Sequence, residues 1–107
     1  MTDFVIKPSE IHGFGCFAAR EFDQAELIVA HVLVFPKEDV STIAAHTFPW
    51  GKGESSIVLS ELSYCNASDD PRLKIVAIDK DKRTKTFIVL KHTRAGDELT
   101  LKYKVTN

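Results

Sequence analysis

Three short segments carry the residue types that could bind a ligand or do chemistry. The first is Gly13-Phe14-Gly15, whose two glycines allow positive φ angles and close approach of the backbone to a ligand. The second is the stretch 64–71, which contains Asn66, and the third is the stretch 96–103, which ends in the hydroxyl of Tyr103. Taken singly, each segment is typical of a turn or a short strand.

Patterns for other kinds of site are missing from the sequence. The histidines at positions 12, 31, 46 and 92 are not at metal-ligand spacings, and Cys16 and Cys65 form no CxxC pair, so we predict no metal. We expect both cysteines to be buried free thiols, which pack as small hydrophobic residues. The chain also has neither a GxSxG elbow nor a GxxxxGK[ST] phosphate-binding loop.

Composition indicates one globular domain, spanning residues 1–107. Hydrophobic residues make up 44% of the chain and charged residues 27%, which is typical of a folded protein. The formal net charge of -1 provides no overall field for binding nucleic acid or an anionic membrane. No signal peptide is visible at the N-terminus, and no apolar run is long enough to span a bilayer. We therefore expect an intracellular protein that is not secreted.

Short apolar runs separated by turn residues predict a mainly β fold. We expect strands at residues 4–7, 16–19, 26–35, 73–79, 86–90 and 99–103, and a short strand or helical turn at 56–59. Residues 37–46 form the best helical stretch. We expect a loop at 50–54, in which Trp50 either anchors a partner or covers the core, a turn at 66–72 through Asp69 and Asp70, and a solvated hairpin tip at 80–85.

The three segments, taken in order, resemble the SET domain family of protein-lysine methyltransferases. Members typically carry Gly-x-Gly then Phe-Ala, an Asn-His-Ser-x-x-Pro segment with an aromatic residue two before the Asn, and Gly-Glu-Glu-Leu-Thr-x-x-Tyr. The matching positions here are Gly13-x-Gly15 then Phe17-Ala18, Tyr64-x-Asn66-x-Ser68 then Pro71, and Gly96-Asp97-Glu98-Leu99-Thr100 then Tyr103. Residues 23–28 are similar to the family turn x-x-Gly-Glu-x-Ile, with Ala25 in place of glycine.

The resemblance implies a SET-type β-clip fold: short strands in small sheets, one or two short helices and a C-terminal segment threaded as a pseudoknot. It also implies methyl transfer from S-adenosylmethionine (SAM) to a lysine of a protein or peptide substrate. The donor would lie against the backbone of Gly13, Phe14 and Gly15, beside Tyr64, and would be held by Asn66 and the backbone of Ala67. Tyr103 would be the catalytic residue, and His46 and Phe48 would border the substrate channel.

The chain also departs from the family pattern, and this leaves an alternative function open. Ala67 stands where the family has histidine, the strand expected at 73–79 has no aromatic residue, and the chain stops four residues after Tyr103. A SET fold without catalysis, serving as a binding or oligomerisation module, is the second hypothesis. A homodimer that pairs exposed sheet edges is a third.

Overall fold

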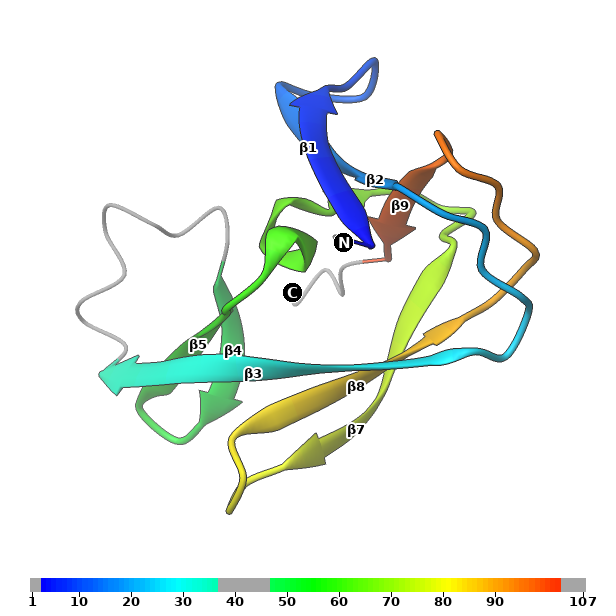
Figure 1. The fold of residues 1–107 in the computed structure, drawn as a ribbon. Coiled ribbons are helices and arrows are strands. Elements are labelled where there is room, and N and C mark those ends of the chain that lie inside the picture. Colours follow the sequence, from blue (N-terminus) through cyan, green and yellow to red (C-terminus); the bar gives the residue numbers. More distant parts are fainter. Residues whose placement is uncertain (1–2, 37–46, 103–107) are drawn as a thin grey trace.

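The computed structural model describes residues 3–36 and 47–102, which form nine strands and one short 3-10 helix in this part of the chain (Figure 1). The strands are β1 (Phe4–Pro8), β2 (Phe14–Ala18), β3 (Leu27–Pro36), β4 (Thr47–Gly51), β5 (Glu54–Val58), β6 (Asn66–Ala67), β7 (Leu73–Asp79), β8 (Thr84–Val89) and β9 (Glu98–Leu101), and the helix η3 spans Glu61–Tyr64. No helix in the described ranges has the length and apolar character needed to cross a membrane.

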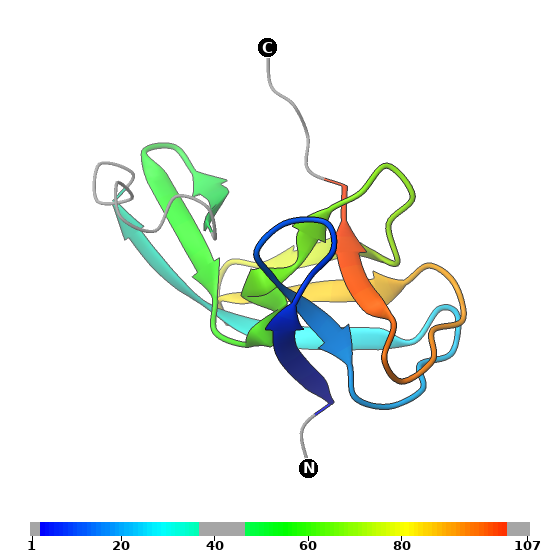
Figure 2. The same ribbon diagram turned by 90° about the horizontal axis from the view of Figure 1, so that it is seen from above.

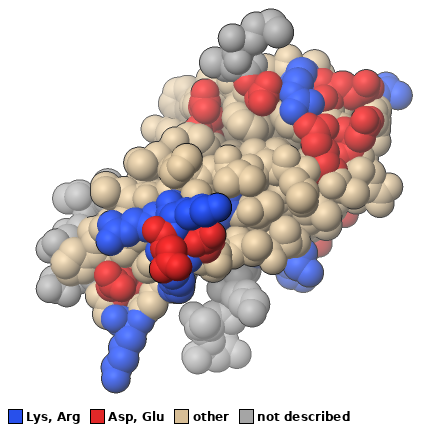
Figure 3. Space-filling view, turned by 60° about the horizontal axis from the view of Figure 1, so that its bottom comes forward, with Lys and Arg blue, Asp and Glu red and all other residues tan. Residues whose placement is uncertain are grey.

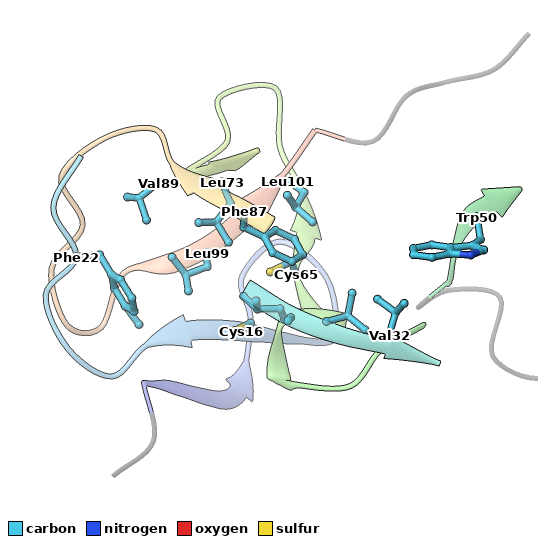
Figure 4. Packing of buried hydrophobic residues seen from close by; sticks show 14 residues of the cluster. Cys16, Phe22, Val32, Trp50, Cys65, Leu73, Phe87, Val89, Leu99 and Leu101 are labelled. Carbon is cyan, nitrogen blue, oxygen red and sulfur yellow. The ribbon is translucent and has the colours of Figure 1, made fainter. Parts of the chain in front are cut away.

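The strands build two sheets, one of order β1-β2-β9-β6 and one of order β4-β5-β3-β8-β7. The core lies between them (Figures 1 and 4). Its fully buried side chains include Phe22, Leu62, Leu73, Phe87 and Leu99, each 0% exposed. This burial of apolar surface is the main force holding the two sheets together.

Strand β3 is the central strand of the larger sheet, and it pairs with different strands along its length. Its first half, Leu27 to His31, pairs with β8, and its second half, Val32 to Pro36, pairs with β5. The hairpin of β4 and β5 therefore lies on the opposite side of β3 from β8 and β7 (Figure 2). Alternate residues of β3 point to opposite faces, with Ala30 and Val32 in the core.

The mainly β prediction is confirmed, and the predicted strands lie within two or three residues of those observed. The loop predicted at 50–54 is wrong, because β4 continues through Gly51 and β5 begins at Glu54. Gly53, with φ of +76°, makes the connecting turn tight enough for the two strands to pair up to their ends. The predicted helix at 37–46 and the threading of the segment after residue 102 lie outside the described residues.

Trp50 packs into the core, which confirms the second of its two predicted roles and excludes the first, an exposed partner anchor. Its side chain is only 9% exposed. The ammonium of Lys80 stands 4.3 Å from the centroid of its ring and also donates to its backbone carbonyl. This arrangement ties the tip of the β7–β8 hairpin to strand β4.

The solvated tip predicted at 80–85 is shorter than expected. Strand β8 begins at Thr84, so only residues 80–83 form the turn. Lys85 then falls on the inward face of β8, opposite Ala30, and is 1% exposed. Burial, together with the positive charge of Lys80, lowers its pKa from 10.5 to about 8.

Ala25 occupies the position where the family pattern has glycine, and its backbone explains that pattern. It has a φ of +72°, in the left-handed region that costs an L-residue about 1–2 kcal/mol. Its amide donates to the carbonyl of Val89 at 2.7 Å, which fixes the turn that leads into β3.

Candidate functional site

The sheet β1-β2-β9-β6 brings the three sequence motifs side by side. Strand β9 lies between β2, which carries the glycine motif, and β6, which carries Asn66. Cys16 pairs with Leu99 on one side, and Asn66 pairs in parallel with Thr100 on the other. The amide of Ser68 donates to the carbonyl of Leu101 at 2.9 Å and extends the parallel pairing. Segments more than 80 residues apart in the chain thus meet at one place.

The side-chain amide of Asn66 is fixed in orientation by its neighbours. Its Nδ2 lies 3.0 Å from the carbonyl oxygen of His12, 3.3 Å from that of Phe14 and 2.9 Å from Oε2 of Glu98. All three are acceptors, so the nitrogen must face them and Oδ1 must face away. Asn66 thereby holds the glycine motif against β9 and offers a carbonyl oxygen as its remaining polar group.

Glu98 is the centre of this network, although its position in the sequence predicts no role for it in the site. Its half-buried carboxylate accepts from the Ser9 hydroxyl, at 2.8 Å to Oε1 and 2.9 Å to Oε2, as well as from Asn66. The Ser9 hydroxyl in turn accepts from the amide of Ile11 at 2.9 Å. A lone acidic residue after a glycine turn is a weak signal, and only the pairing of β9 with both neighbours shows what it reaches.

The two glycines of the first motif are required for different physical reasons. Gly13 has a φ of +46°, which favours glycine, and has open space where a Cβ would lie. Gly15 lacks a positive φ, but a Cβ there would lie 2.3 Å from Oε2 of Glu98. The missing side chain of Gly15 therefore makes room for the Glu98 carboxylate.

Two buried thiols lie next to the residues of this network in the sequence. Cys16 follows Gly15, Cys65 precedes Asn66, and both are free and buried, as predicted. A hydrogen bond with Cys16, followed by burial, raises the pKa of the Cys65 thiol well above its usual range. Both side chains therefore act as small apolar groups packed between β2 and η3.

Exposed apolar side chains and a hollow lie next to the network. Phe14 is 59% exposed, Ile11 is 52% exposed, and Tyr64, at the end of η3, is 40% exposed. A hollow of about 440 Å³ borders Glu98 and is lined further by Lys7, Pro8, Glu10, Ile11 and Phe17. Open space and exposed aromatic groups beside fixed polar atoms are features of a ligand site.

The remaining predicted site residues stand as follows. Tyr103 and His46 lie outside the described residues. Phe48 lies in β4, where its backbone is opposite Ser56. Ala67 is exposed in β6, opposite Leu101. Their predicted roles, like those of Gly13, Phe14, Gly15, Tyr64 and Asn66 toward a ligand, stay predictions.

One cluster of possible metal ligands could not be seen in the sequence. Glu21, Asp23 and His92 are exposed, and their ligand atoms lie within 4.8 Å of one another. His92 Nε2 is 2.8 Å from Oε2 of Glu21. The bridge between Phe22 and Thr93 brings these two loops together, which residue spacing along the chain does not indicate.

Comparison with known proteins identifies one family. The family model for the SET domain matches residues 13–104, and no curated protein sequence matches the chain significantly. A Plasmodium falciparum protein named as a candidate histone methyltransferase has a similar structure, with a TM-score of 0.80, 16% identity, and coverage of 99% of this chain and 96% of that one. A humanized mutant of Polycomb Repressive Complex 2 from Chaetomium thermophilum, bound to the inhibitor GSK126, has a TM-score of 0.73 and 20% identity. The match covers 94% of this chain and 14% of that one. At these identities the two structures show a common fold.

Proposed function

Since the chain belongs to the SET domain family, we propose that it is a SAM-dependent protein-lysine N-methyltransferase. The observation that carries the proposal is the meeting of Asn66, Glu98 and the glycine motif in one hydrogen-bonded network. The proposed substrate is an intracellular protein or peptide with an accessible lysine.

The polar groups of the network suit the amino-acid end of SAM. With Nδ2 of Asn66 directed at three acceptors, its Oδ1 is oriented to accept a hydrogen bond from an ammonium group. The carboxylate of Glu98 adds a negative charge 2.9 Å from the Asn66 amide, and a negative charge favours a cationic ligand. Both the α-ammonium and the sulfonium of SAM are cations, so we infer that the network fits the methionine portion of the donor.

The rest of the proposed donor site is backbone and apolar surface. The backbone of Gly13 to Gly15 has the close approach that a ligand needs, because Gly13 presents no side chain to the open space beside it. Phe14, in the glycine motif, and Tyr64, two residues before Asn66, are exposed aromatic side chains. We propose that they pack against the adenine ring. Ala67 would contribute only its backbone.

SAM, when bound, supplies an electrophilic methyl group on a positively charged sulfur. The work left to the protein is mainly orientation, and well-oriented reactants can gain about 7–11 kcal/mol over reaction in free solution. The lysine must arrive neutral, because only a free amine has the electron pair that attacks. We propose that the hydroxyl of Tyr103 orients this amine and that His46 and Phe48 border the channel through which the lysine enters.

The alternative function is a SET fold that binds a partner without catalysis. The specific observation in its favour is Ala67, an exposed methyl group where the family pattern has a histidine side chain. Loss of that side chain leaves the adenine portion of SAM with backbone contacts alone at this position. Such a protein would bind SAM weakly or not at all.

Calorimetric titration with SAM separates the two functions. The enzyme hypothesis expects binding of SAM and weaker binding of S-adenosylhomocysteine, which lacks the sulfonium charge. The absence of any heat or thermal shift at millimolar SAM would refute it. If SAM binds, Tyr103→Phe should abolish most methylation of a lysine peptide library without changing SAM affinity.

A further inference from the structure

The outer face of the larger sheet carries an apolar stripe along β3. Leu27, Val29 and Leu33 point away from the core and are 59%, 62% and 51% exposed. Their neighbours on β8 on this face include Thr86, opposite Val29, and Thr84, opposite His31. Large aliphatic side chains at alternate positions of an outward face suggest that something covers this face.

The stripe protrudes at Leu27 and borders a hollow further along β3. The hollow, of about 890 Å³, lies over the middle of β3 and the β7–β8 hairpin, and it is lined by Val29, His31, Ala77, Ile78, Asp79, Lys80, Lys82, Thr84 and Thr86. Leu27 is not among these residues. It stands at the start of β3, and its side chain projects into solvent.

The two ends of the stripe also differ in charge. The loop before β3 carries Glu21 and Asp23, both exposed, and Glu26, which is paired with Arg20. The hairpin tip carries Lys80, Lys82 and Arg83 against Asp79 and Asp81, an excess of one positive charge. Figure 3 looks onto this side of the molecule: a band without charged side chains separates a group made up mainly of carboxylates from a mixed group of lysine, arginine and carboxylate side chains.

We propose that a second copy of this chain covers the stripe, related to the first by a two-fold axis close to Val29. In this arrangement the two β3 strands run antiparallel across the interface. Leu27 of each copy enters the hollow of the other, and the acidic loop of each copy meets Lys82 and Arg83 of the other. In a two-fold dimer every contact occurs twice, so the surface must be complementary to itself after half a turn.

The outer face of this sheet meets that requirement in two independent ways. The protruding Leu27 and the hollow lie on the same face, and the mainly acidic loop and the hairpin tip of net positive charge lie at opposite ends of that face. Leu27 and His31, the latter lining the hollow, each stand two residues from Val29 along β3. A partner of uniform charge would match one end of the stripe and be repelled by the other, which favours a second copy over such a partner.

Sedimentation velocity of the purified full chain tests the dimer. The wild type should be a dimer at micromolar concentration, and Val29→Asp should be a monomer with unchanged circular dichroism, because the new carboxylate would face its own copy across the axis. Val5→Asp is the matched control: Val5 is 41% exposed on β1, in the other sheet, and the variant should remain dimeric. A wild-type monomer at high micromolar concentration, or a dimeric Val29→Asp, overturns the proposal that a second copy covers the stripe.

Charge reversal tests the two-fold arrangement itself. Glu21→Lys and Lys82→Glu should each weaken the dimer at least several-fold, because each places like charges together in both copies. An equimolar mixture of the two variants should associate more tightly than either variant alone, since both of its charge contacts are again between opposite charges. If the mixture is no tighter than the separate variants, the antiparallel arrangement is wrong even if a dimer exists.

Discussion

Lys85 should make the stability of the protein depend on pH between about pH 8 and pH 10.5. Its side chain is 1% exposed, and its pKa is lowered from 10.5 to about 8, first by burial and second by Lys80. The unfolded chain exposes the same group, so its pKa there returns to about 10.5. Between pH 8 and 10.5 the unfolded state therefore binds the proton more tightly than the folded state does.

The size of the effect follows from the shift. Each pKa unit corresponds to about 1.4 kcal/mol, so the charged form of Lys85 costs the folded state about 3 kcal/mol below pH 8. Because the folded pKa is lowered, the penalty is complete at pH 7, declines as the pH rises through 8, and is under about 1 kcal/mol at pH 10. The free energy of unfolding should rise by about 2–2.5 kcal/mol over this range through Lys85 alone.

The measurement is urea denaturation of the wild type and Lys85→Met at pH 7 and pH 10. Methionine keeps the apolar stem without the charge, so the difference in unfolding free energy between the two proteins should change by about 2–2.5 kcal/mol across the range, in favour of wild type at the higher pH. Cys65 acts in the opposite direction, since a raised thiol pKa destabilises the folded state at high pH. That contribution is common to both proteins and cancels in the difference.

Lys74→Met provides the control, because Lys74 is exposed on the neighbouring strand β7. Its difference from wild type should be the same at both pH values. If the Lys85→Met difference is also the same at pH 7 and pH 10, then Lys85 does not titrate with a lowered pKa and the reasoning from its burial is refuted.

Three further changes have expected outcomes. Ala25→Gly should stabilise the protein by about 0.5–1 kcal/mol in thermal or urea unfolding, since it relieves a φ of +72°, and a loss of stability would contradict this. Gly15→Ala should destabilise it and, if SAM binds the wild type, lower SAM affinity at least tenfold in calorimetry, because its Cβ would displace the Glu98 carboxylate. Leu99→Ala should cost about 2–5 kcal/mol in urea unfolding, as Leu99 is 0% exposed, and a cost below about 1 kcal/mol would mean that the core closes over the space.

Local patterns in the sequence were sufficient for most of the strands. The alternation of apolar residues placed β7 at its observed bounds, and β3 within one residue of them. The errors fell where a turn was shorter than its composition suggested. Glycines around Trp50 were interpreted as a loop, although Gly53 alone makes the turn, and the charged run 80–85 hid the burial of Lys85.

The candidate site was predictable only as separate motifs. Resemblance to the family identified Gly13, Gly15 and Asn66, but it gave no role to Glu98, which contacts Ser9 and Asn66 across 89 and 32 residues of chain. Such contacts depend on the order of strands within a sheet, and that order leaves no mark on local periodicity. For the same reason Glu21, Asp23 and His92 could not be recognised as neighbours.

The position of β9 between β2 and β6 also bears on how the protein is made. The candidate site includes Glu98, which pairs with Phe17 and which a ribosome adds 81 residues after it. The glycine motif and Asn66 are therefore synthesised well before β9, the strand that joins them. Until β9 is added, β2 and β6 lack the strand that pairs with both of them in the smaller sheet. Contacts so distant in sequence form slowly after the rest of the chain has collapsed. A chain truncated before β9 should thus lack the site, and the site can form only after residues 98–101 have left the ribosome.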